Sequence, residues 1–591
     1  MLICYPFSGW AEQYCVKATG LAEKAGSVVF SANECTNAAN NSAMSMSNFN
    51  GVTFSAGDTV YFSASAGDYS IQMTIPSGGN SDADVAYEGL ADGAADAYPL
   101  IDVSGNIFNA AGVSIVNKSY ITLKNFRVKG SGGNGAFRVY GNSGHEGYTV
   151  NVYNVSVLSN YGASDATNSH DCFSAGGTAQ AQFQDCSADK CRPETDPFVG
   201  SHQALTTHES SMVKWYRGSM SDSNYFAVAV TGSRIDIYNA NCNDAKIVGF
   251  DSPKSWCNVY DSTIVSNTGK VAQSGSEGTV RIEGSYITIN SGTLTLISGV
   301  LELIDNRLVL YAPDFRWAAL NADGIIIADG NDIKIADCST HLFSGPNGYQ
   351  GAYKLYRNLV TATSTDGFVV ISDTSADSSI LYNIFNKCLS SDVISVHAGI
   401  ENDHMVANNL FYRANPGGVG IEIDGPAAEG AVGVHNNIFY NISNSIQGGE
   451  HATSISHNDY YNSSYEGSIG SIDSDPRFLS VGNDFRLQTD SPCIMQGAEA
   501  GVLGLTGEQT DFFDNTLDFD FSDLMNIGPD QKSLTNSSND DPITEQRNLS
   551  KNTSSSGGCF IATAAYGSSM VKEIQNVPKN SVAYFSVFLS D

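Results

Sequence analysis

The sequence predicts an all-β protein built as a right-handed parallel β-helix solenoid, followed by a polar linker and a short C-terminal tag. Three observations favour this fold class. Short alternating β runs, with few amphipathic helical patterns, recur from about residue 120 to residue 460. These runs end in Asn, Asp or Gly, which accept the left-handed backbone of a sharp corner. Successive copies lie about 21 to 32 residues apart, a period typical of a solenoid.

The recurring unit is apolar-x-apolar-x-(Asn/Asp/Gly). Clear copies end at Asn125, Asn154, Asn239, Gly284, Asp305 and Asn436, and weaker copies end at Asp185, Asp261 and Arg357. Alternating residues point to opposite faces of a strand, and no amphipathic helix follows the unit, so parallel β coils are favoured over leucine-rich repeats. An antiparallel sandwich is the alternative, but it would place a turn every 8 to 12 residues or so.

Composition and charge argue against some classes of function. The chain has 591 residues, 41% of them hydrophobic, which is enough for a large core. It carries 30 Lys and Arg against 62 Asp and Glu, for a net charge of −32, and such a field repels nucleic acid and anionic lipid. The acidity is compatible with Ca²⁺ sites and with solubility alone. No apolar run is long enough to span a membrane.

The chain divides by composition into consecutive parts. The first residues resemble the tail of a signal peptide, with the small residues Gly9 and Ala11 near a cleavage point, and an ordinary buried strand is the alternative. The expected parts are 1–11 as a signal-peptide remnant, 12–118 as N-terminal cap and first coils, 119–465 as β-helix coils, 466–530 as the closing segment, 531–557 as the linker and 558–591 as the tag.

Several segments resemble the pectate-lyase-like β-helix superfold over residues 50–530. They are Ala56–Phe62, Asn408–Tyr412, Asn436–Tyr440, Asp475–Phe478, Asp484–Leu487, Ser491–Pro492 and Asn526–Gly528. The resemblance implies the fold and no single activity, because the superfold hosts lyases, hydrolases, epimerases, tailspikes and adhesins. Gly557–Ser568 is similar to the Cys-Phe-Ile box at the C-termini of exported prokaryotic proteins, which implies a secreted or cell-surface protein; a small docking helix is the alternative.

The 12 cysteines include groups close enough in sequence to suggest pairs. These are Cys15 with Cys35, Cys242 with Cys257, and two of Cys172, Cys186 and Cys191. Buried unpaired thiols stacked between coils are the alternative. No CxxC pair or Cys/His zinc spacing occurs.

An internal repeat indicates where chemistry could lie. At an offset of 32 residues, His170 aligns with His202, Phe173 with Leu205 and Ala181 with Val213. At an offset of 31, His145 and Glu146 align with Gly176 and Gly177, which lie under His208 and Glu209. If Phe173 and Leu205 point inward, alternation places His170, Ser174, His202, Thr206 and His208 outward. A polar excursion over residues 185–201 would rise beside this patch.

A uronate lyase must neutralise the C6 carboxylate, remove the C5 proton and protonate the leaving oxygen. Lys190 or Arg192 could bind the carboxylate, and His208 or His202 could act as the base. Thr206–Glu209 resembles the Asp-Pro-His-Glu signature of β-helix alginate epimerases, but the Asp and Pro are absent. Hydrolysis would instead need paired carboxylates, for which Asp171, Asp189 and Asp196 are candidates.

We therefore expect two sets of site residues and no protein-held metal. The expected catalytic residues are His208, His202, His170, Lys190, Arg192 and Asp171. The expected substrate-binding residues are His145, Glu209, Thr206, Asp189 and Asp196. A metal held by His145, His202 and His208 is a less favoured alternative, as is a hydrogen-bonded histidine ladder without turnover.

Other candidates lie outside this patch. Asp373, His397 and Asp424 follow strands in later coils and are interpreted as solvated surface. Trp215, Trp256 and Trp317 could stack on sugars, although core packing is the commoner role.

The favoured hypothesis is an exported, monomeric enzyme that acts on extracellular uronic-acid polysaccharide by β-elimination, with Ca²⁺ as a candidate cofactor. A cell-surface adhesin or glycan-binding solenoid without chemistry, and a hydrolase or epimerase on the same fold, are the alternatives.

Overall fold

A computed structural model of the protein describes most of the chain before residue 532. The described residues are 11–94, 97–103, 111–130, 135–141, 149–159, 170–189, 191, 202–221, 225–243, 247–249, 254–267, 271–292, 294–312, 314–320, 323–336, 341–344, 350–362, 368–371, 376–387, 392–397, 402–424, 432–464, 468–505 and 507–531. Residues 1–533 and 534–591 form separate units, so the description below concerns the first unit. The predicted Cys-Phe-Ile tag and nearly all of the predicted linker and signal remnant lie outside the described residues.

The described chain winds through three parallel sheets, which we call faces I, II and III. Face I contains β1 (Gln13–Lys17), β3 (Thr59–Ser63), β5 (Val85–Leu90), β8 (Ile121–Lys129), β10 (Val150–Ser159), β12 (Gln180–Gln184), β15 (Met212–Tyr216), β18 (Arg234–Tyr238), β21 (Trp256–Tyr260), β24 (Thr279–Glu283), β27 (Val300–Ile304), β30 (Ile325–Asp329), β32 (Ala352–Tyr356), β35 (Ser378–Leu381), β38 (His404–Ala407), β40 (Val432–His435) and β42 (Ser454–Ser456).

Faces II and III complete each coil. Face II contains β6 (Leu100–Asp102), the second halves of β8 and β10, β13 (Ser187–Asp189), β16 (Ser219–Ser221), β19 (Asn241–Asn243), β22 (Thr263–Ser266), β25 (Tyr286–Ile289), β28 (Arg307–Leu310), β31 (Asp332–Ile335), β33 (Leu359–Ala362), β36 (Ile384–Asn386), β39 (Leu410–Asp424) and β41 (Ile438–Gln447). Face III contains β4 (Met73–Thr74), β7 (Val113–Val116), β9 (Phe137–Gly141), β11 (His170–Gly177), β14 (His202–Thr207), β17 (Tyr225–Ala229), β20 (Ile247–Gly249), β23 (Ala272–Ser274), β26 (Leu294–Ile297), β29 (Arg316–Ala319), β34 (Val369–Ile371), β37 (Asp392–His397) and the second halves of β39 and β41.

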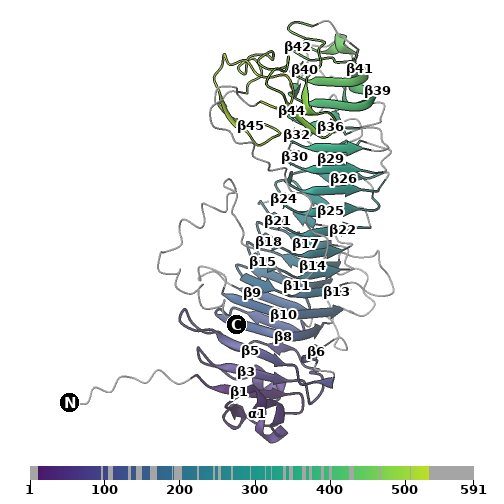
Figure 1. Ribbon diagram of the computed structural model, residues 1–591. Helices are drawn as coiled ribbons and strands as arrows, with labels where there is room; N and C mark the ends of the chain where they lie inside the picture. The colour runs from purple at the N-terminus through teal and green to yellow at the C-terminus, as the bar shows by residue number, and fades with distance from the viewer. Residues whose placement is uncertain are drawn as a thin grey trace, which may run out of the picture. The chain divides into compact units, whose positions relative to one another are not determined.

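Most of the described coils give one strand to each face in a fixed order. The chain runs from β11 on face III to β12 on face I and β13 on face II, and then β14 pairs in parallel with β11. Figure 1 shows the coils stacked from β1 to β42. The predicted parallel β-helix is therefore confirmed.

Strand alternation builds the core. In β24, Val280 and Ile282 are buried while Thr279, Arg281 and Glu283 are not, as the sequence pattern predicts. Like residues stack between coils, so that apolar area is buried coil upon coil. The rings of Phe385, Phe411 and Phe439, for example, are stacked with centroids 5.0 and 4.9 Å apart.

The corner between faces I and II follows the predicted pattern. All the predicted corner residues have a positive φ: Asn125, Asn154, Asp185, Asn239, Asp261, Gly284, Asp305, Arg357 and Asn436. Asn and Asp tolerate this conformation because their short polar side chains bond locally.

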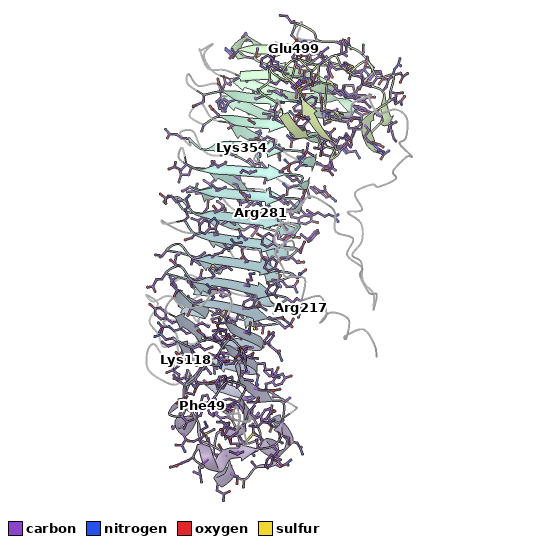
Figure 2. The ribbon with its side chains drawn as sticks, turned by 90° about the vertical axis from the view of Figure 1, so that its left-hand side faces the viewer. Phe49, Lys118, Arg217, Arg281, Lys354 and Glu499 are labelled. Carbon is purple, nitrogen blue, oxygen red and sulfur yellow. A yellow bond between two sulfur atoms is a disulfide. The ribbon has the colours of Figure 1, made fainter. Side chains whose placement is uncertain are left out.

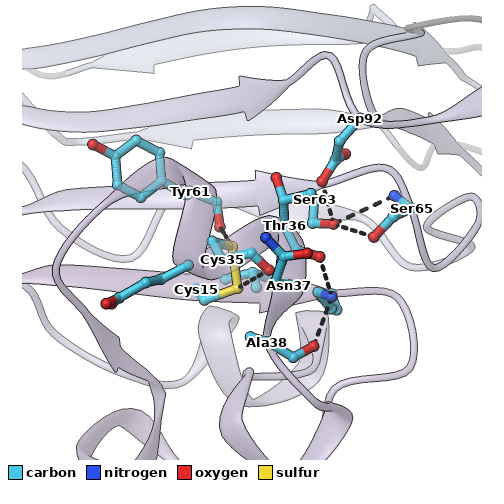
Figure 3. The surroundings of a disulfide bond; sticks show 12 residues. Cys15, Cys35, Thr36, Asn37, Ala38, Tyr61, Ser63, Ser65 and Asp92 are labelled. Atoms are coloured by element: carbon cyan, nitrogen blue, oxygen red, sulfur yellow. Dashed lines mark hydrogen bonds between the residues drawn. A yellow bond between two sulfur atoms is a disulfide. The ribbon is translucent and has the colours of Figure 1, made fainter.

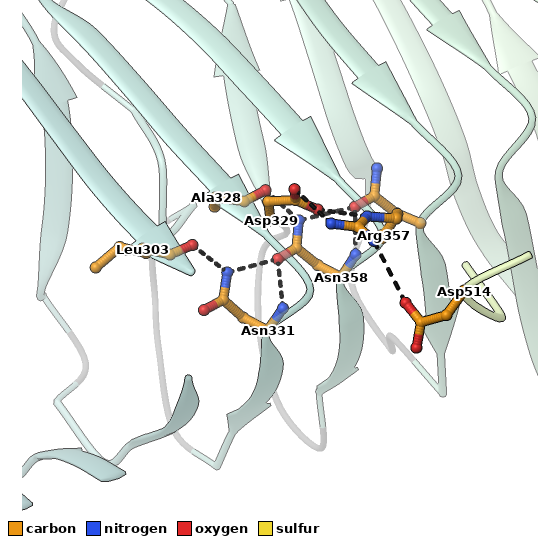
Figure 4. Close-up of polar contacts among 8 residues, drawn as sticks. Leu303, Ala328, Asp329, Asn331, Arg357, Asn358 and Asp514 are labelled. Carbon is orange, nitrogen blue, oxygen red and sulfur yellow. Dashed lines mark hydrogen bonds and ion pairs between the residues drawn. The ribbon is translucent and has the colours of Figure 1, made fainter. Parts of the chain in front are cut away.

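A ladder of buried asparagines lies beside this corner in the later coils (Figure 4). Its members are Asn306, Asn331, Asn358, Asn383, Asn409, Asn437 and Asn458. The Oδ1 atom of Asn358, for example, accepts bonds from the backbone N and Nδ2 of Asn331 at 3.1 and 2.9 Å. The ladder satisfies turn amides that would otherwise be buried without partners.

Short helices and a disulfide close the N-terminal end. The elements are η1 (Lys24–Ser27), β2 (Val28–Val29), α1 (Ala32–Asn37), η2 (Asn40–Ser42) and α2 (Met46–Asn50). Phe49 of α2, labelled in Figure 2, is fully buried against Phe62. The Cys15–Cys35 disulfide joins β1 to α1, beneath Tyr61 (Figure 3).

The other cysteines divide differently from the prediction. Cys172 and Cys191 form the second disulfide, and Cys186 is a free buried thiol. The suggested pairing of Cys242 with Cys257 is wrong, because both are free buried thiols. Cys242 stacks in the interior of face II and Cys257 in the interior of face I, where each replaces an aliphatic side chain.

The chain after β42 covers the sides of the last coils. It contains the hairpins β43 (Phe478–Ser480) with β44 (Asp484–Leu487) and β45 (Gly507–Thr510) with β46 (Thr516–Phe519), whereas the short helix η4 (Gly449–His451) lies just before β42. Leu503 packs with outward Leu381 of face I, and Phe485 packs with outward Leu410 of face II. Arg357 bonds Asp329 through two nitrogens at 2.7 and 2.6 Å and also bonds Asp514 of this segment at 3.3 Å (Figure 4).

Candidate functional site

The structure confirms the predicted 32-residue offset between β11 and β14. The paired residues are His170 with His202, Phe173 with Leu205, and Ala181 with Val213 on the neighbouring face. The side chains of His170 and His202 lie outside the described part of the structure. So do the whole of His145, Lys190, Arg192 and Asp196.

The predicted 31-residue offset holds between β10 and β12, where Val150 pairs with Ala181, but it is wrong on face III. Gly176 pairs with Tyr140 and Gly177 with Gly141, an offset of 36 residues, so His145 is not the residue aligned with Gly176. The lengths of the connections between strands vary, and an alignment by strand pattern alone cannot locate the extra residues. Tyr140 therefore occupies the column that ends at His208.

Three successive coils meet at Glu209. The Tyr140 hydroxyl donates to Oε2 of Glu209 at 2.7 Å, and the backbone N of Gly177 donates to the same oxygen at 3.1 Å. Gly176 makes this reach possible, because a Cβ there would lie 2.8 Å from the Tyr140 ring. The ring therefore lies over Gly176 of β11, and its hydroxyl reaches Glu209 two coils further along the solenoid.

Arg138 and His208 complete a group that we call the Tyr140 cluster: Arg138, Tyr140, His208 and Glu209. The Arg138 guanidinium carbon lies 5.0 Å from the centre of the Tyr140 ring, within the range of a cation–π contact. The backbone N of His208 donates to Ala175 O at 2.9 Å, which holds His208 at the end of β14. Four polar side chains from β9 and the end of β14 thus share one edge of face III.

The protonation states in this cluster suit proton transfer. Burial lowers the pKa of His208 below its ordinary value of 6.5, although the charge of Glu209 opposes the shift. The hydrogen bond from Tyr140 lowers the pKa of Glu209, and the same bond raises the pKa of Tyr140. At neutral pH the cluster therefore holds a neutral imidazole, a carboxylate, a protonated phenol and a guanidinium.

Such a set can perform acid–base chemistry on an anionic substrate. A neutral imidazole can accept a proton, a phenol can donate one, and a guanidinium can neutralise a carboxylate. Sequence reasoning missed Arg138 and Tyr140. Their alternation around the buried Val139 marks both as outward residues of one strand, but only the coil register places them beside His208.

Asp171 of β11 and Thr206 of β14 are buried side chains of face III. Asp171 is 4% exposed and Thr206 is 1% exposed, so neither lies open to a polymer in solution. Burial raises the pKa of Asp171 to about 7, while a hydrogen bond with Thr206 opposes the shift. The Thr206 hydroxyl also donates a hydrogen bond to Oε1 of Gln203.

This geometry predicts how Asp171 affects stability. A group whose pKa rises from 3.8 to about 7 on folding stabilises the fold fully below 3.8, and the contribution is lost as the pH rises toward 7. We expect the free energy of unfolding of the wild type to fall by about 1.4 kcal/mol for each pH unit in this window, relative to that of Asp171→Asn. Urea unfolding of both proteins at pH 4, 5.5 and 7 measures the difference. Parallel pH dependences in the two proteins would contradict the assignment.

Asp189 lies away from the Tyr140 cluster. It is exposed on β13 of face II, where it accepts a bond from the Ser221 hydroxyl at 2.7 Å. The structure therefore does not bring Asp189 together with Asp171 as a carboxylate pair for hydrolysis.

Two of the three candidates from later coils lie next to each other in the structure. His397 and Asp424 are aligned in register on face III, with Nδ1 and Oδ2 separated by 3.7 Å. Asp424 is 73% exposed, and beside it Gln447 donates to Glu422 at 2.8 Å. This arrangement matches the solvated surface predicted for it, and Asp373 lies outside the described residues.

The tryptophans divide between core and surface. Trp215 and Trp317 are fully buried, whereas Trp256 is 37% exposed on the outward side of β21. Of the three, only Trp256 can reach a ligand in solution.

Comparisons with known proteins leave the family open. No protein-family model matches the chain, and no curated protein sequence gives a significant match to it.

In the described ranges, no group of three or more His, Cys, Asp or Glu side chains could hold a metal ion. The helices in that part of the chain are all too short or too polar to cross a bilayer.

Proposed function

We propose that the protein is an exported lyase that cleaves uronic-acid-containing polysaccharide by β-elimination at the Tyr140 cluster. The observation that carries this proposal is the convergence of a cation, a neutral imidazole and a phenol around Glu209 on one edge of the solenoid. These are the three functions that elimination from a uronate requires.

The proposed reaction assigns one step to each side chain. Arg138 pairs with the C6 carboxylate and stabilises the negative charge that develops when the C5–H bond breaks. His208 takes the C5 proton, the C4–O bond breaks as the C4–C5 double bond forms, and Tyr140 protonates the leaving oxygen. Proton transfer from the resulting imidazolium, directly or through solvent, restores Tyr140. Glu209 positions Tyr140 and does not react.

Three features support export. The N-terminal residues resemble a signal-peptide tail, and the C-terminal segment is similar to a box found in exported proteins. The Cys15–Cys35 and Cys172–Cys191 disulfides are typical of an oxidising compartment. Extracellular polysaccharide is the proposed partner, and Ca²⁺ is proposed as an aid to binding the acidic substrate.

The test is a direct assay for the elimination product. The full chain is incubated with polygalacturonate, alginate and glycosaminoglycans, with Ca²⁺ or with a chelator, while ultraviolet absorbance of the unsaturated uronate is followed. We expect product on one substrate class. New reducing ends without that absorbance would indicate hydrolysis, and neither product on any polymer would overturn the enzyme proposal in favour of a non-catalytic glycan-binding solenoid.

A further inference from the structure

A second polar and aromatic surface begins where the Tyr140 cluster ends. After Glu209 the chain turns into β15, whose first residue, Met212, pairs in register with Arg234 of β18, and Arg234 pairs with Trp256 of β21. These three outward positions form one column along the edge of face I. Coils repeat at about 4.8 Å, so the column leads away from the cluster in steps of that size.

Arg234 is held in place by a buried carboxylate. Its Nε donates to both oxygens of Asp236 at 2.9 and 2.8 Å, and Nδ2 of Asn258 donates to Oδ1 at 2.7 Å. Asp236 is 2% exposed although it lies on the outward side of face I, whereas the Arg234 side chain is 46% exposed. A buried acceptor beneath an exposed guanidinium pre-organises that guanidinium.

Another arginine of face I shows what an ordinary surface pair looks like. Arg281 also bonds the acid two residues along its strand, Glu283, and the acid in the next coil, Glu302. All three of those side chains are about equally accessible, at 32%, 28% and 25%. The deep burial of Asp236 therefore sets the Arg234 position apart.

Aromatic side chains flank Arg234. The indole of Trp256 is the next outward group in its column, and the rings of Tyr216, Tyr238 and Tyr260 stack with centroids 4.9 Å apart at the opposite end of the same strands. Lys214 pairs in register with Asp236, so two cations accompany one carboxylate. The group is thus locally positive in a chain of net charge −32.

We infer that Arg234 and Trp256 form a substrate-binding edge that holds a uronate polymer beyond the Tyr140 cluster, along the solenoid axis. Arg234 pairs with a substrate carboxylate, and Trp256 packs against a sugar ring. The inference rests on the proposed function and deepens it, because it assigns the enzyme to long acidic polymers that span several coils and not to short oligomers.

The experiment measures binding of the full chain to polygalacturonate and alginate by affinity electrophoresis, with neutral dextran as the uncharged probe. Arg234→Gln and Trp256→Ala are each expected to weaken binding of the acidic polymer by about tenfold. The matched controls are Arg307→Gln and Tyr286→Ala. These residues also form an exposed arginine–aromatic contact, at 5.7 Å, but on face II. Thermal unfolding of all four variants checks that the fold is intact.

The outcomes separate this inference from the proposed function. Elimination activity together with equal binding by wild type, Arg234→Gln and Trp256→Ala would overturn the edge and leave the lyase standing. Weaker binding by these two variants without any elimination product would support the edge as a glycan-binding surface and overturn the lyase. Equal losses in the face II controls, or dextran binding as tight as that of the acidic polymers, would overturn the edge.

Discussion

Replacing His208 with alanine is expected to lower turnover of the uronate substrate by about 100- to 10,000-fold while leaving the fold intact. The reason is that His208 supplies the only neutral imidazole of the Tyr140 cluster as the structure describes it. Its side chain is half-buried at the end of β14 and packs little into the core, so the free energy of unfolding should change by less than about 1 kcal/mol. Initial rates of product absorbance measure the effect.

The pH profile gives a second readout of the same assignment. Because burial holds the pKa of His208 below 6.5, the base form predominates at neutral pH. We expect kcat/KM to fall only at pH values below the ordinary histidine pKa, as the imidazole becomes protonated. His397→Ala, which removes an exposed histidine from a later coil of face III, serves as the control and should leave the profile unchanged. Full activity in His208→Ala would contradict the assignment of His208 as the catalytic base.

Replacing Asn383 with alanine is expected to destabilise the protein by about 3 to 5 kcal/mol. The Asn383 side chain donates to Leu355 O, Leu381 O and Oδ1 of Asn409, at 2.9 to 3.1 Å. Its Oδ1 accepts from the backbone N and Nδ2 of Asn358, both at 2.9 Å. The substitution therefore leaves several buried polar groups without their partners.

The control for this prediction is Asn290→Ala, which removes an exposed bond of 2.8 Å to Asn267 and should cost less than about 0.5 kcal/mol. Urea unfolding followed by far-ultraviolet circular dichroism compares the two variants. Coils of a solenoid can unfold separately, so the transition of the later coils is the one to compare. Similar midpoints for both variants would show that the ladder contributes little.

Much of the fold follows from the sequence because the interactions that specify it are local. Alternation within a strand decides which residues enter the core, and a corner residue such as Asn239 or Arg357 must accept a left-handed backbone. Both features depend on a few consecutive residues. The repeat of His170 at His202 was also predictable, because strand and corner recur there at one spacing.

Only the tertiary structure decided the candidate site. Glu209 receives bonds from Tyr140 and Gly177, which are 69 and 32 residues away, and the pairing depends on how the intervening connections fold. Strand pattern predicts which face a residue occupies but not which residue lies above it when connection lengths vary. Asp171 is a second example. Its raised pKa arises from burial in the folded chain, which the sequence does not reveal. Local sequence therefore determines the coil architecture. The register between coils, which brings the side chains of the candidate site together, is determined by tertiary packing.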